Sequence, residues 1–225
     1  MLDKITVIIV HYKTLKLTKA AFNSLRKFYP SIKIVIVNNG DDAESESFLA
    51  DAAKLDGNLI VLSPDKNLHH GPGMDFAISK ISTDWFLTFD SDSKLLKENL
   101  LEDMISLLNS DTYAVGEFIK MNELGFFAKE GEKSFNYVHP KCALFDRQKY
   151  LTLPPFIKHG SPCISNEIAA KDAGYELIDF PVNNYISHPG RGTVGIYGYK
   201  LGIKGKINLL RSEYIRKYLK LIFSR

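Results

Sequence analysis

The stretch WFLTFDSD, residues 85–92, decides the fold assignment, because it joins an apolar run to two alternating acidic residues. The apolar part, with the residue before it, predicts a strand over 84–89 that is buried on both faces, as strands of parallel sheets are. Residues two apart in extended backbone point the same way, so Asp90 and Asp92 are expected to face one site. Such a pair suits a hard divalent cation, although Asp and Ser also start ordinary turns.

Strands and helices alternate upstream of this stretch. Continuous β-branched or aliphatic runs predict strands over 5–10, 32–37 and 58–62, and helical spacing of apolar residues predicts helices over 17–28, 45–54 and 73–81. A further helix is expected over 95–108. Alternation of this kind predicts βαβ crossovers and a parallel sheet, in which ligands sit at the carboxyl ends of the strands.

The second half of the chain is less regular. Strands are expected over 113–119, 135–145 and 176–181, and a helix over 164–173, with Gly174 where a helix C-cap would lie. The two halves together predict an α/β domain.

Composition limits the classes of protein that the chain can belong to. It has 225 residues, of which 45% are apolar and 24% charged, as in a globular protein with a sizeable core. Cys142 and Cys163 form no CxxC pair, so we expect free thiols rather than a zinc site or a disulfide. We expect neither a signal peptide nor a membrane span, and therefore a cytoplasmic location.

The charge is concentrated near the C-terminal end. Eight cations and one acid, Glu213, follow Tyr199, so this segment carries a charge of about +7. Apolar residues recur there at helical spacing, which predicts a basic amphipathic helix. Such a helix either docks on an anionic membrane surface, which would make the protein peripheral on the inner face, or packs on the domain with a solvated basic face.

Four segments in register carry a resemblance to a known family. The segments ITVIIVHYK (5–13), IKIVIVNNGDD (32–42), NLHHGPGMDFAIS (67–79) and WFLTFDSDS (85–93) resemble family-2 glycosyltransferases of the GT-A fold. The likeness covers residues 4–110 well and 136–193 more loosely. It implies a mixed sheet flanked by helices, with a catalytic domain over 1–195 and a basic helical tail over 196–225. Residues 1–110 would be the nucleotide-binding half and 111–195 the acceptor-binding half.

The resemblance also implies where a nucleotide-diphosphate sugar binds. The ends of the first two strands would hold the base, although Asn38 stands where the family usually has Asp. Glycines in the third segment would let the backbone approach the phosphates. The implied donor contacts are His11, Tyr12, Asn38, Asn39, Asn67, Gly71, Gly73, Asp75, Asp90, Ser91, Arg191 and Thr193.

A metal site is implied at the same strand end. Asp92 and the late histidine, His188, would ligate Mn²⁺ or Mg²⁺, with Asp90 as a further ligand or a contact to the ribose. A neutral imidazole suits Mn²⁺ better than Mg²⁺.

The catalytic base departs from the family pattern. Inverting members carry an acidic pair about a dozen residues before a Gly-Tyr, and here that position holds Pro162-Cys163. Glu167 and His159 are the candidate bases, each with an ordinary structural alternative. A retaining mechanism that needs no such base is also open.

The sequence therefore predicts a metal-dependent glycosyltransferase of the hexosyl- or deoxyhexosyltransferase class. The acceptor would be a glycan or a lipid-linked sugar in surface polysaccharide or glycoconjugate synthesis. One alternative is a nucleotide- or carbohydrate-binding module that has lost catalysis. Another is a haloacid dehalogenase-like phosphatase, which shares the DxD but needs a later acidic pair that this sequence lacks. No motif supports nucleic-acid binding.

Overall fold

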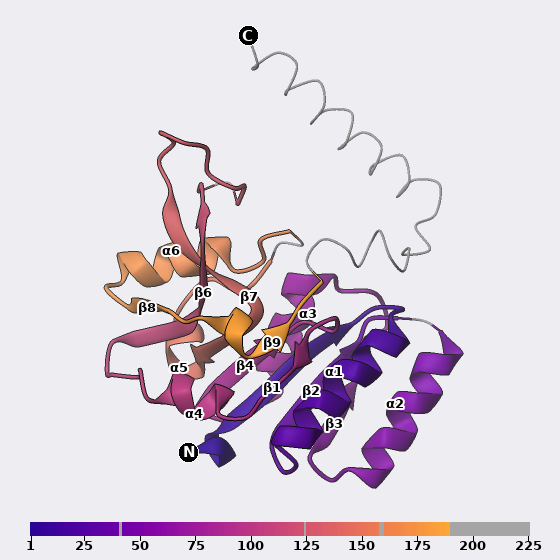
Figure 1. Ribbon diagram of the computed structural model, residues 1–225. Coiled ribbons are helices and arrows are strands. Elements are labelled where there is room, and N and C mark those ends of the chain that lie inside the picture. The colour runs from indigo at the N-terminus through magenta and orange to yellow at the C-terminus, as the bar shows by residue number, and fades with distance from the viewer. Residues whose placement is uncertain (41, 124, 158–159, 190–225) are drawn as a thin grey trace. The chain divides into compact units, whose positions relative to one another are not determined.

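The computed structural model describes residues 1–40, 42–123, 125–157 and 160–189, and Met1–Pro189 forms one unit. A seven-stranded sheet crosses its centre in the order β3-β2-β1-β4-β7-β6-β8, with helices on both faces (Figure 1). The predicted α/β class and the mixed sheet flanked by helices are confirmed. The expected tail, 196–225, lies outside the described residues.

The sheet is parallel where the sequence alternates and mixed where it does not. β1 pairs in parallel with both β2 and β4, and β2 with β3. β7 runs antiparallel to β4 and to β6, and β8 runs parallel to β6. The strands are β1 Ile5–His11, β2 Lys33–Asn38, β3 Leu59–Leu62, β4 Trp85–Phe89, β6 Thr112–Met121, β7 Phe135–Asp146 and β8 Glu176–Asp179.

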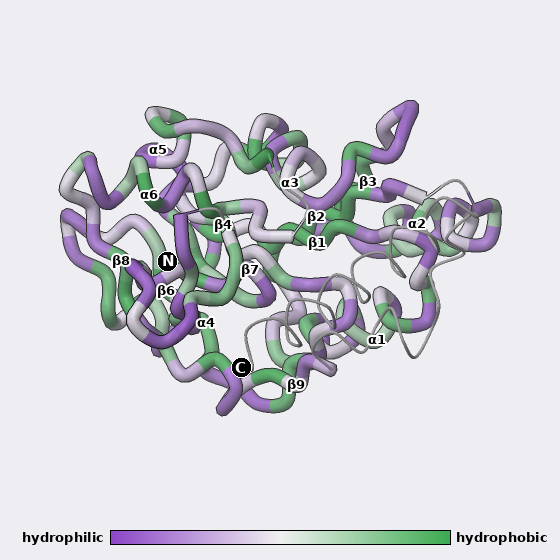
Figure 2. The backbone as a smooth tube through the Cα atoms, turned by 90° about the horizontal axis from the view of Figure 1, so that it is seen from above, coloured by the Kyte–Doolittle hydropathy of each residue, from purple (hydrophilic) through white to green (hydrophobic). Residues whose placement is uncertain are grey.

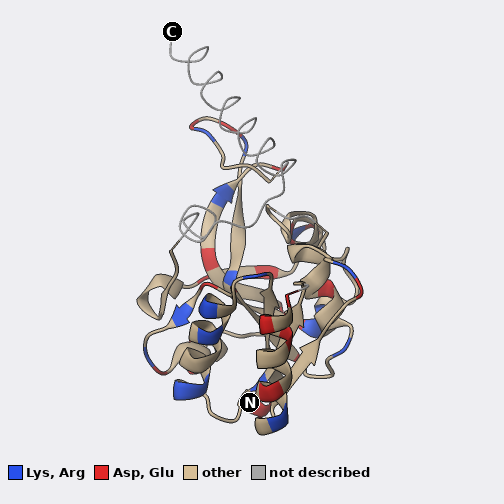
Figure 3. Ribbon diagram, turned by 90° about the vertical axis from the view of Figure 1, so that its right-hand side faces the viewer, with Lys and Arg blue, Asp and Glu red and all other residues tan. Residues whose placement is uncertain are grey.

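Alternation along the central strands feeds two separate cores. Val7 and Ile9 of β1 pack with α1, α2 and α4 on one face, whereas Ile8 packs with α3, α5 and α6 on the other. Figure 2 shows β1 and β2 as a hydrophobic centre, and Figure 3 shows most charged residues on helices and loops. The helices are α1 Leu15–Phe28, α2 Ala43–Leu55, α3 His70–Ile78, α4 Leu100–Ile105, α5 Arg147–Tyr150 and α6 Ile164–Asp172, with short 3₁₀ turns at Leu2–Lys4 and Val182–Asn184.

The predicted helix over 95–108 is wrong in part. Lys94–Leu95 forms strand β5, which pairs antiparallel with β9, Ile186–Ser187, and only Leu100–Ile105 is α-helical. Leu95 N donates to Ser24 Oγ at 2.9 Å, so this segment is held by contacts remote in sequence. Tertiary pairing has overridden the helical spacing of the leucines.

Helix α3 begins earlier than predicted. Its first residue is His70, so the Gly-Pro-Gly sequence lies inside the first turn rather than before the helix. Pro72 is tolerated there because the first N–H groups of a helix have no intrahelical partner. The shift places His70 at the helix start, close to the carboxyl end of β4.

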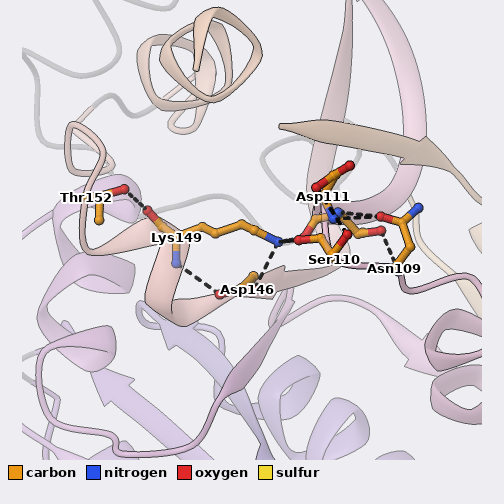
Figure 4. Close-up of polar contacts among 7 residues, drawn as sticks. Asn109, Ser110, Asp111, Asp146, Lys149 and Thr152 are labelled. Carbon is orange, nitrogen blue, oxygen red and sulfur yellow. Dashed lines mark hydrogen bonds and ion pairs between the residues drawn. The ribbon is translucent and has the colours of Figure 1, made fainter. Parts of the chain in front are cut away.

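A lysine of α5 connects this helix to the loop before β6. Lys149 Nζ donates to Ser110 O at 2.7 Å and lies 3.3 Å from the Asp146 carboxylate (Figure 4). Asp146 also caps α5 by accepting from Lys149 N. These contacts fasten α5 to the loop before β6.

Within the described residues, no helix is long and apolar enough to cross a membrane. Cys142 and Cys163 are buried free thiols, as expected.

Candidate metal and donor site

Asp90 and Asp92 lie in a tight turn at the carboxyl end of β4. Asp90 N donates to Lys141 O of β7 at 2.9 Å, which extends the β4–β7 pairing by one residue. Ser93 N then donates to Asp90 O at 2.9 Å and closes the turn. Both carboxylates are half-buried, with 19% and 10% of their side-chain surface exposed.

His188 reaches these carboxylates because β9 pairs with β5. The pairing aligns Ser187 with Lys94, two residues after Asp92, so the residue that follows β9 arrives beside the turn. His188 Nε2 lies 3.3 Å from Asp90 Oδ2 and 3.2 Å from Asp92 Oδ1. The structure therefore brings together the three side chains that the sequence predicted as metal ligands.

This trio fits a divalent cation. One ligand atom from each of Asp90, Asp92 and His188 lies within 4.8 Å of the other two. Two carboxylates and one imidazole suit Mn²⁺ or Mg²⁺, and a cation held by three protein ligands keeps positions for phosphate oxygens. The group is half-buried, so an incoming diphosphate can reach it.

Charge pairing dominates the electrostatics of the trio. Burial alone would raise the pKa of Asp90, but a hydrogen bond from His188 and the nearby His70 and His139 lower it to about 2. Burial would likewise lower the pKa of His188, but its bonds to Asp90 and Asp92 raise it to about 9. In the metal-free protein the imidazolium of His188 thus pairs with both carboxylates.

Two more histidines lie near Asp90, and neither was predicted as a metal ligand. His70 Nε2 lies 3.4 Å from Asp90 Oδ1, and the His139 ring centroid lies 6.5 Å from that of His188. The signal that could have found His70 is its place in the segment between β3 and β4, whose carboxyl ends meet at one edge of the sheet.

In the neutral ring of His139, Nε2 is a hydrogen-bond donor and has no lone pair to offer a metal. Its Nδ1 accepts from Lys141 N at 3.2 Å, which in the neutral ring puts the proton on Nε2. Burial lowers the pKa of His139, although Asp90 opposes this effect, so the neutral form is favoured. Its Nε2 is therefore not available as a metal ligand in this geometry.

The residues expected to bind the base lie in different environments. His11 is fully buried, and its ring nitrogens contact Thr18 Oγ1 at 2.8 Å and Ser45 Oγ at 3.0 Å. His11 therefore joins β1 to α1 and α2, and it is not among the proposed contacts of the donor. Tyr12 is half-buried, and Asn38 is buried with Oδ1 accepting from Gly40 N.

Asn39 fixes the start of the α3 segment. Its Nδ2 donates to His69 O at 3.0 Å and its Oδ1 accepts from Leu68 N at 3.2 Å. A Cβ on Gly73 would lie 3.0 Å from Asn39 Nδ2, so this glycine is needed for close packing of α3 on β1 and β2. The predicted approach of the Gly73 backbone to the phosphates of the donor stays a prediction.

The other donor residues are placed as follows. Asn67 Oδ1 accepts from His69 N at 2.7 Å, and Asp75 Oδ1 accepts from Tyr150 Oη at 2.6 Å. Gly71 is buried in the first turn of α3, and Ser91 is half-buried between the two aspartates. Arg191 and Thr193 lie outside the described residues.

Glu167 is not part of the metal trio. Glu167 is fully buried, and its Oε2 accepts from Val138 N at 2.8 Å. Burial raises the pKa of Glu167 well above its ordinary value, against the effect of that bond. The side chain therefore sits in the core as a support for β7, and His159 lies outside the described residues.

A hollow lies beside the trio's edge of the sheet. It measures about 420 Å³ and opens at the carboxyl ends of β2 and β3, against α2. Its lining residues are Asn38, Glu46, Ala50, Ala53, Val61 and Ser63.

The sequence matches a described family over most of its length. The family profile described as Glycosyl transferase family 2 matches residues 6–171, more than half of the chain. The teichoic acid poly(glycerol phosphate) polymerase of Staphylococcus epidermidis is 23% identical over 160 residues, which are 65% of this chain and 22% of that protein.

Solved structures share the fold at low identity. A Pyrobaculum calidifontis mannosyltransferase, PcManGT, in complex with GDP-Man and Mn²⁺, aligns with a TM-score of 0.63 and 15% identity over 79% of this chain and 55% of its own. S. aureus TarS 1-349 aligns at 0.57 and 14% over 81% and 59%, and GalNAc-T7 with UDP, GalNAc and Mn²⁺ at 0.63 and 13% over 82% and 42%. The chain thus spans less than two thirds of each of these proteins.

Proposed function

Because the chain belongs to glycosyl transferase family 2, we propose that it transfers a sugar from a nucleotide-diphosphate donor to a glycan or lipid-linked acceptor. The family match replaces the phosphatase alternative. The transferred sugar is proposed to be a hexose or deoxyhexose.

The convergence of Asp90, Asp92 and His188 carries this proposal. A Mn²⁺ or Mg²⁺ ion held there would neutralise the charge that develops on the leaving diphosphate. The mannosyltransferase and GalNAc-T7 structures, which both contain Mn²⁺, support the choice of metal. The protein's own part is to hold two carboxylates and an imidazole at one end of β4.

The hollow beside β2 and β3 is the proposed site for the base of the donor. Asn38 lines it, and an amide can bond to the edge of either a uracil or a guanine. Solved relatives contain GDP-Man or UDP-GlcNAc, which supports a uridine or guanosine diphosphate sugar. Tyr12, Asn39, Asn67, Asp75, Ser91, Arg191 and Thr193 remain proposed contacts of this donor.

A cell-surface polymer is the proposed setting of the reaction. The curated relative is named as a polymerase of teichoic acid, which supports an acceptor in surface polysaccharide or glycoconjugate synthesis. The basic tail predicted over 196–225 would bring the enzyme to the membrane where lipid-linked acceptors lie.

One observation favours a second candidate, a donor-binding module without transfer. Cys163, at the position of the expected acidic pair, is fully buried, and no carboxylate replaces it there. A module of this kind would bind donor and metal but would leave the sugar bond intact.

A panel of nucleotide sugars tests both candidates. Each donor is scored for a Mn²⁺-dependent rise in melting temperature, and the stabilising donors are then assayed for release of the nucleoside diphosphate, with and without acceptor glycans. A transferase stabilised by a uridine or guanosine diphosphate sugar releases the diphosphate with Mn²⁺. Binding without release identifies the module, and no stabilisation by any donor contradicts both.

A further inference from the structure

We propose that His70 is a positioning residue that holds the Asp90 carboxylate so that one oxygen faces the metal. This inference rests on the proposed metal site and names the residue that orients one of its ligands. His70 lies at the start of α3, far in sequence from β4 and from β9.

The two oxygens of Asp90 have different neighbours. Oδ1 lies 3.4 Å from His70 Nε2, whereas Oδ2 lies 3.3 Å from His188 Nε2. The carboxylate is therefore held between two imidazoles, one at each oxygen. His188 also contacts Asp92, so Oδ2 lies on the side of the other two proposed ligands and Oδ1 lies on the side of His70.

His70 stands outside the group of ligands themselves. Among the described residues, the atoms that gather within 4.8 Å of one another come from Asp90, Asp92 and His188, and not from His70. A donor on the outer oxygen of a ligating carboxylate fixes its orientation. Loss of such an outer partner typically weakens metal affinity by 10–100-fold.

The backbone before His70 is held in a strained conformation. His69 has φ 66° and ψ −173°, a region that glycine favours and other residues rarely occupy. Three hydrogen bonds retain it: His69 N donates to Asn67 Oδ1 at 2.7 Å, and His69 O accepts from Asn39 Nδ2 at 3.0 Å and Gly73 N at 3.1 Å. This cost is consistent with a segment that must present the next side chain, His70, in one direction.

Mn²⁺ affinity measured on three variants tests the role of His70. The full chain carries His70→Ala, His70→Gln or His69→Ala, and free Mn²⁺ is followed by electron paramagnetic resonance at constant pH. Gln keeps an N–H donor near the position of Nε2, and His69→Ala removes the exposed neighbouring imidazole on an equally strained backbone. Affinity for a nucleoside diphosphate without metal is measured beside each, because a general structural defect would lower it as well.

We expect His70→Ala to bind Mn²⁺ about tenfold or more weakly, with metal-free nucleotide affinity unchanged. His70→Gln should recover most of the loss, and His69→Ala should match the wild type. Mn²⁺ affinity of His70→Ala equal to that of the wild type overturns the inference. If His70→Ala fails to fold, the test rests on His70→Gln. The inference is overturned if His70→Gln binds Mn²⁺ as weakly as Asp92→Asn does. Absence of Mn²⁺ binding by the wild-type chain contradicts the proposed function itself.

Discussion

The charge state of His188 links the metal site to pH. Its hydrogen bonds to Asp90 and Asp92 outweigh burial and raise its pKa to about 9. Because the folded pKa exceeds the unfolded value, this pairing stabilises the metal-free protein fully below about pH 6.5, and the contribution is lost as pH rises towards 9. Asp90, with its pKa lowered to about 2, contributes above about pH 4 and loses that contribution as pH falls towards 2.

Metal binding must therefore displace a proton. A histidine ligates a metal through a deprotonated nitrogen, so near pH 7 the binding of one Mn²⁺ ion should release about one proton, and affinity should rise until about pH 9. Calorimetric titration with Mn²⁺ in buffers of different ionisation enthalpy measures this number. A binding enthalpy that is the same in all buffers would show that His188 is not a ligand.

Glu167 is a candidate base by sequence, but in the structure its carboxyl is buried in the core. Its buried carboxyl has a raised pKa, so the folded state binds an extra proton above about pH 4.5 and the free energy of unfolding falls as pH rises. Glu167→Gln cannot ionise, so its melting temperature should decline less than that of the wild type between about pH 5 and pH 8. Thermal unfolding across this range is the measurement.

The same variant decides whether Glu167 is a base. Removal of a general base costs a factor of about 10² or more in rate, whereas a neutral isostere in the core leaves transfer nearly unchanged. A hundredfold loss of transfer by Glu167→Gln, with folding intact, would restore Glu167 as the base.

Residue types at strand ends were predictable, and burial was not. Asp90, Asp92 and His188 were found because acidic and imidazole side chains follow apolar strands in the order of a known family. His11 is a residue type equally suited to a ligand site, but both of its ring nitrogens contact hydroxyl groups inside the core. Only packing separates the two outcomes.

Among the elements, those with local signals were predicted well. β1, β2 and β4 are continuous apolar runs ended by polar residues, and the structure places them within a residue or two of the prediction. β5 and β9 have two residues each and exist only because they pair with one another across the fold. No local pattern marks such a ladder, yet it is the contact that delivers His188.

Gly116 of β6 lies so close to β7 that there is no room for a side chain. A Cβ on Gly116 would lie 2.8 Å from Val138 Cγ1 and 3.0 Å from Ala143 Cβ, beside an irregularity in the strand register. Gly116→Ala should therefore lower the free energy of unfolding by about 1–3 kcal/mol, measured by urea denaturation. Gly57→Ala, where a Cβ meets nothing within 4 Å, is the matched control.

A Gly116→Ala protein as stable as the Gly57→Ala control would mean that β6 and β7 are less closely packed than the distances indicate. Loss of Mn²⁺ affinity in Gly116→Ala would further show that the bulge shapes the turn holding Asp90, since Lys141 of β7 pairs with it.

At the scale of the whole molecule, the sequence predicts a division between a slightly acidic body and a basic tail. Eight cations follow Tyr199, and residues 190–225 lie outside the described part of the chain. If this segment docks on membranes, removal of the residues after Gly198 should abolish sedimentation with anionic vesicles while donor binding persists.

Neutral vesicles and raised salt are the controls for that experiment, because electrostatic docking weakens in both. Vesicle binding that survives the truncation would place the membrane contact in the body of the protein.

The central claim is that the carboxylates after β4 bind a cation that holds the diphosphate of the donor. The most direct measurement is the affinity for UDP or GDP as a function of Mn²⁺ concentration, in the wild type, Asp92→Asn and Asp84→Asn. Asp84 precedes β4 at the opposite end of the strand, and its Oδ2 accepts a hydrogen bond from Lys4 Nζ at 2.9 Å. We predict that Mn²⁺ strengthens nucleotide binding in the wild type and in Asp84→Asn, and has little effect in Asp92→Asn. Undiminished Mn²⁺ dependence in Asp92→Asn would contradict the claim.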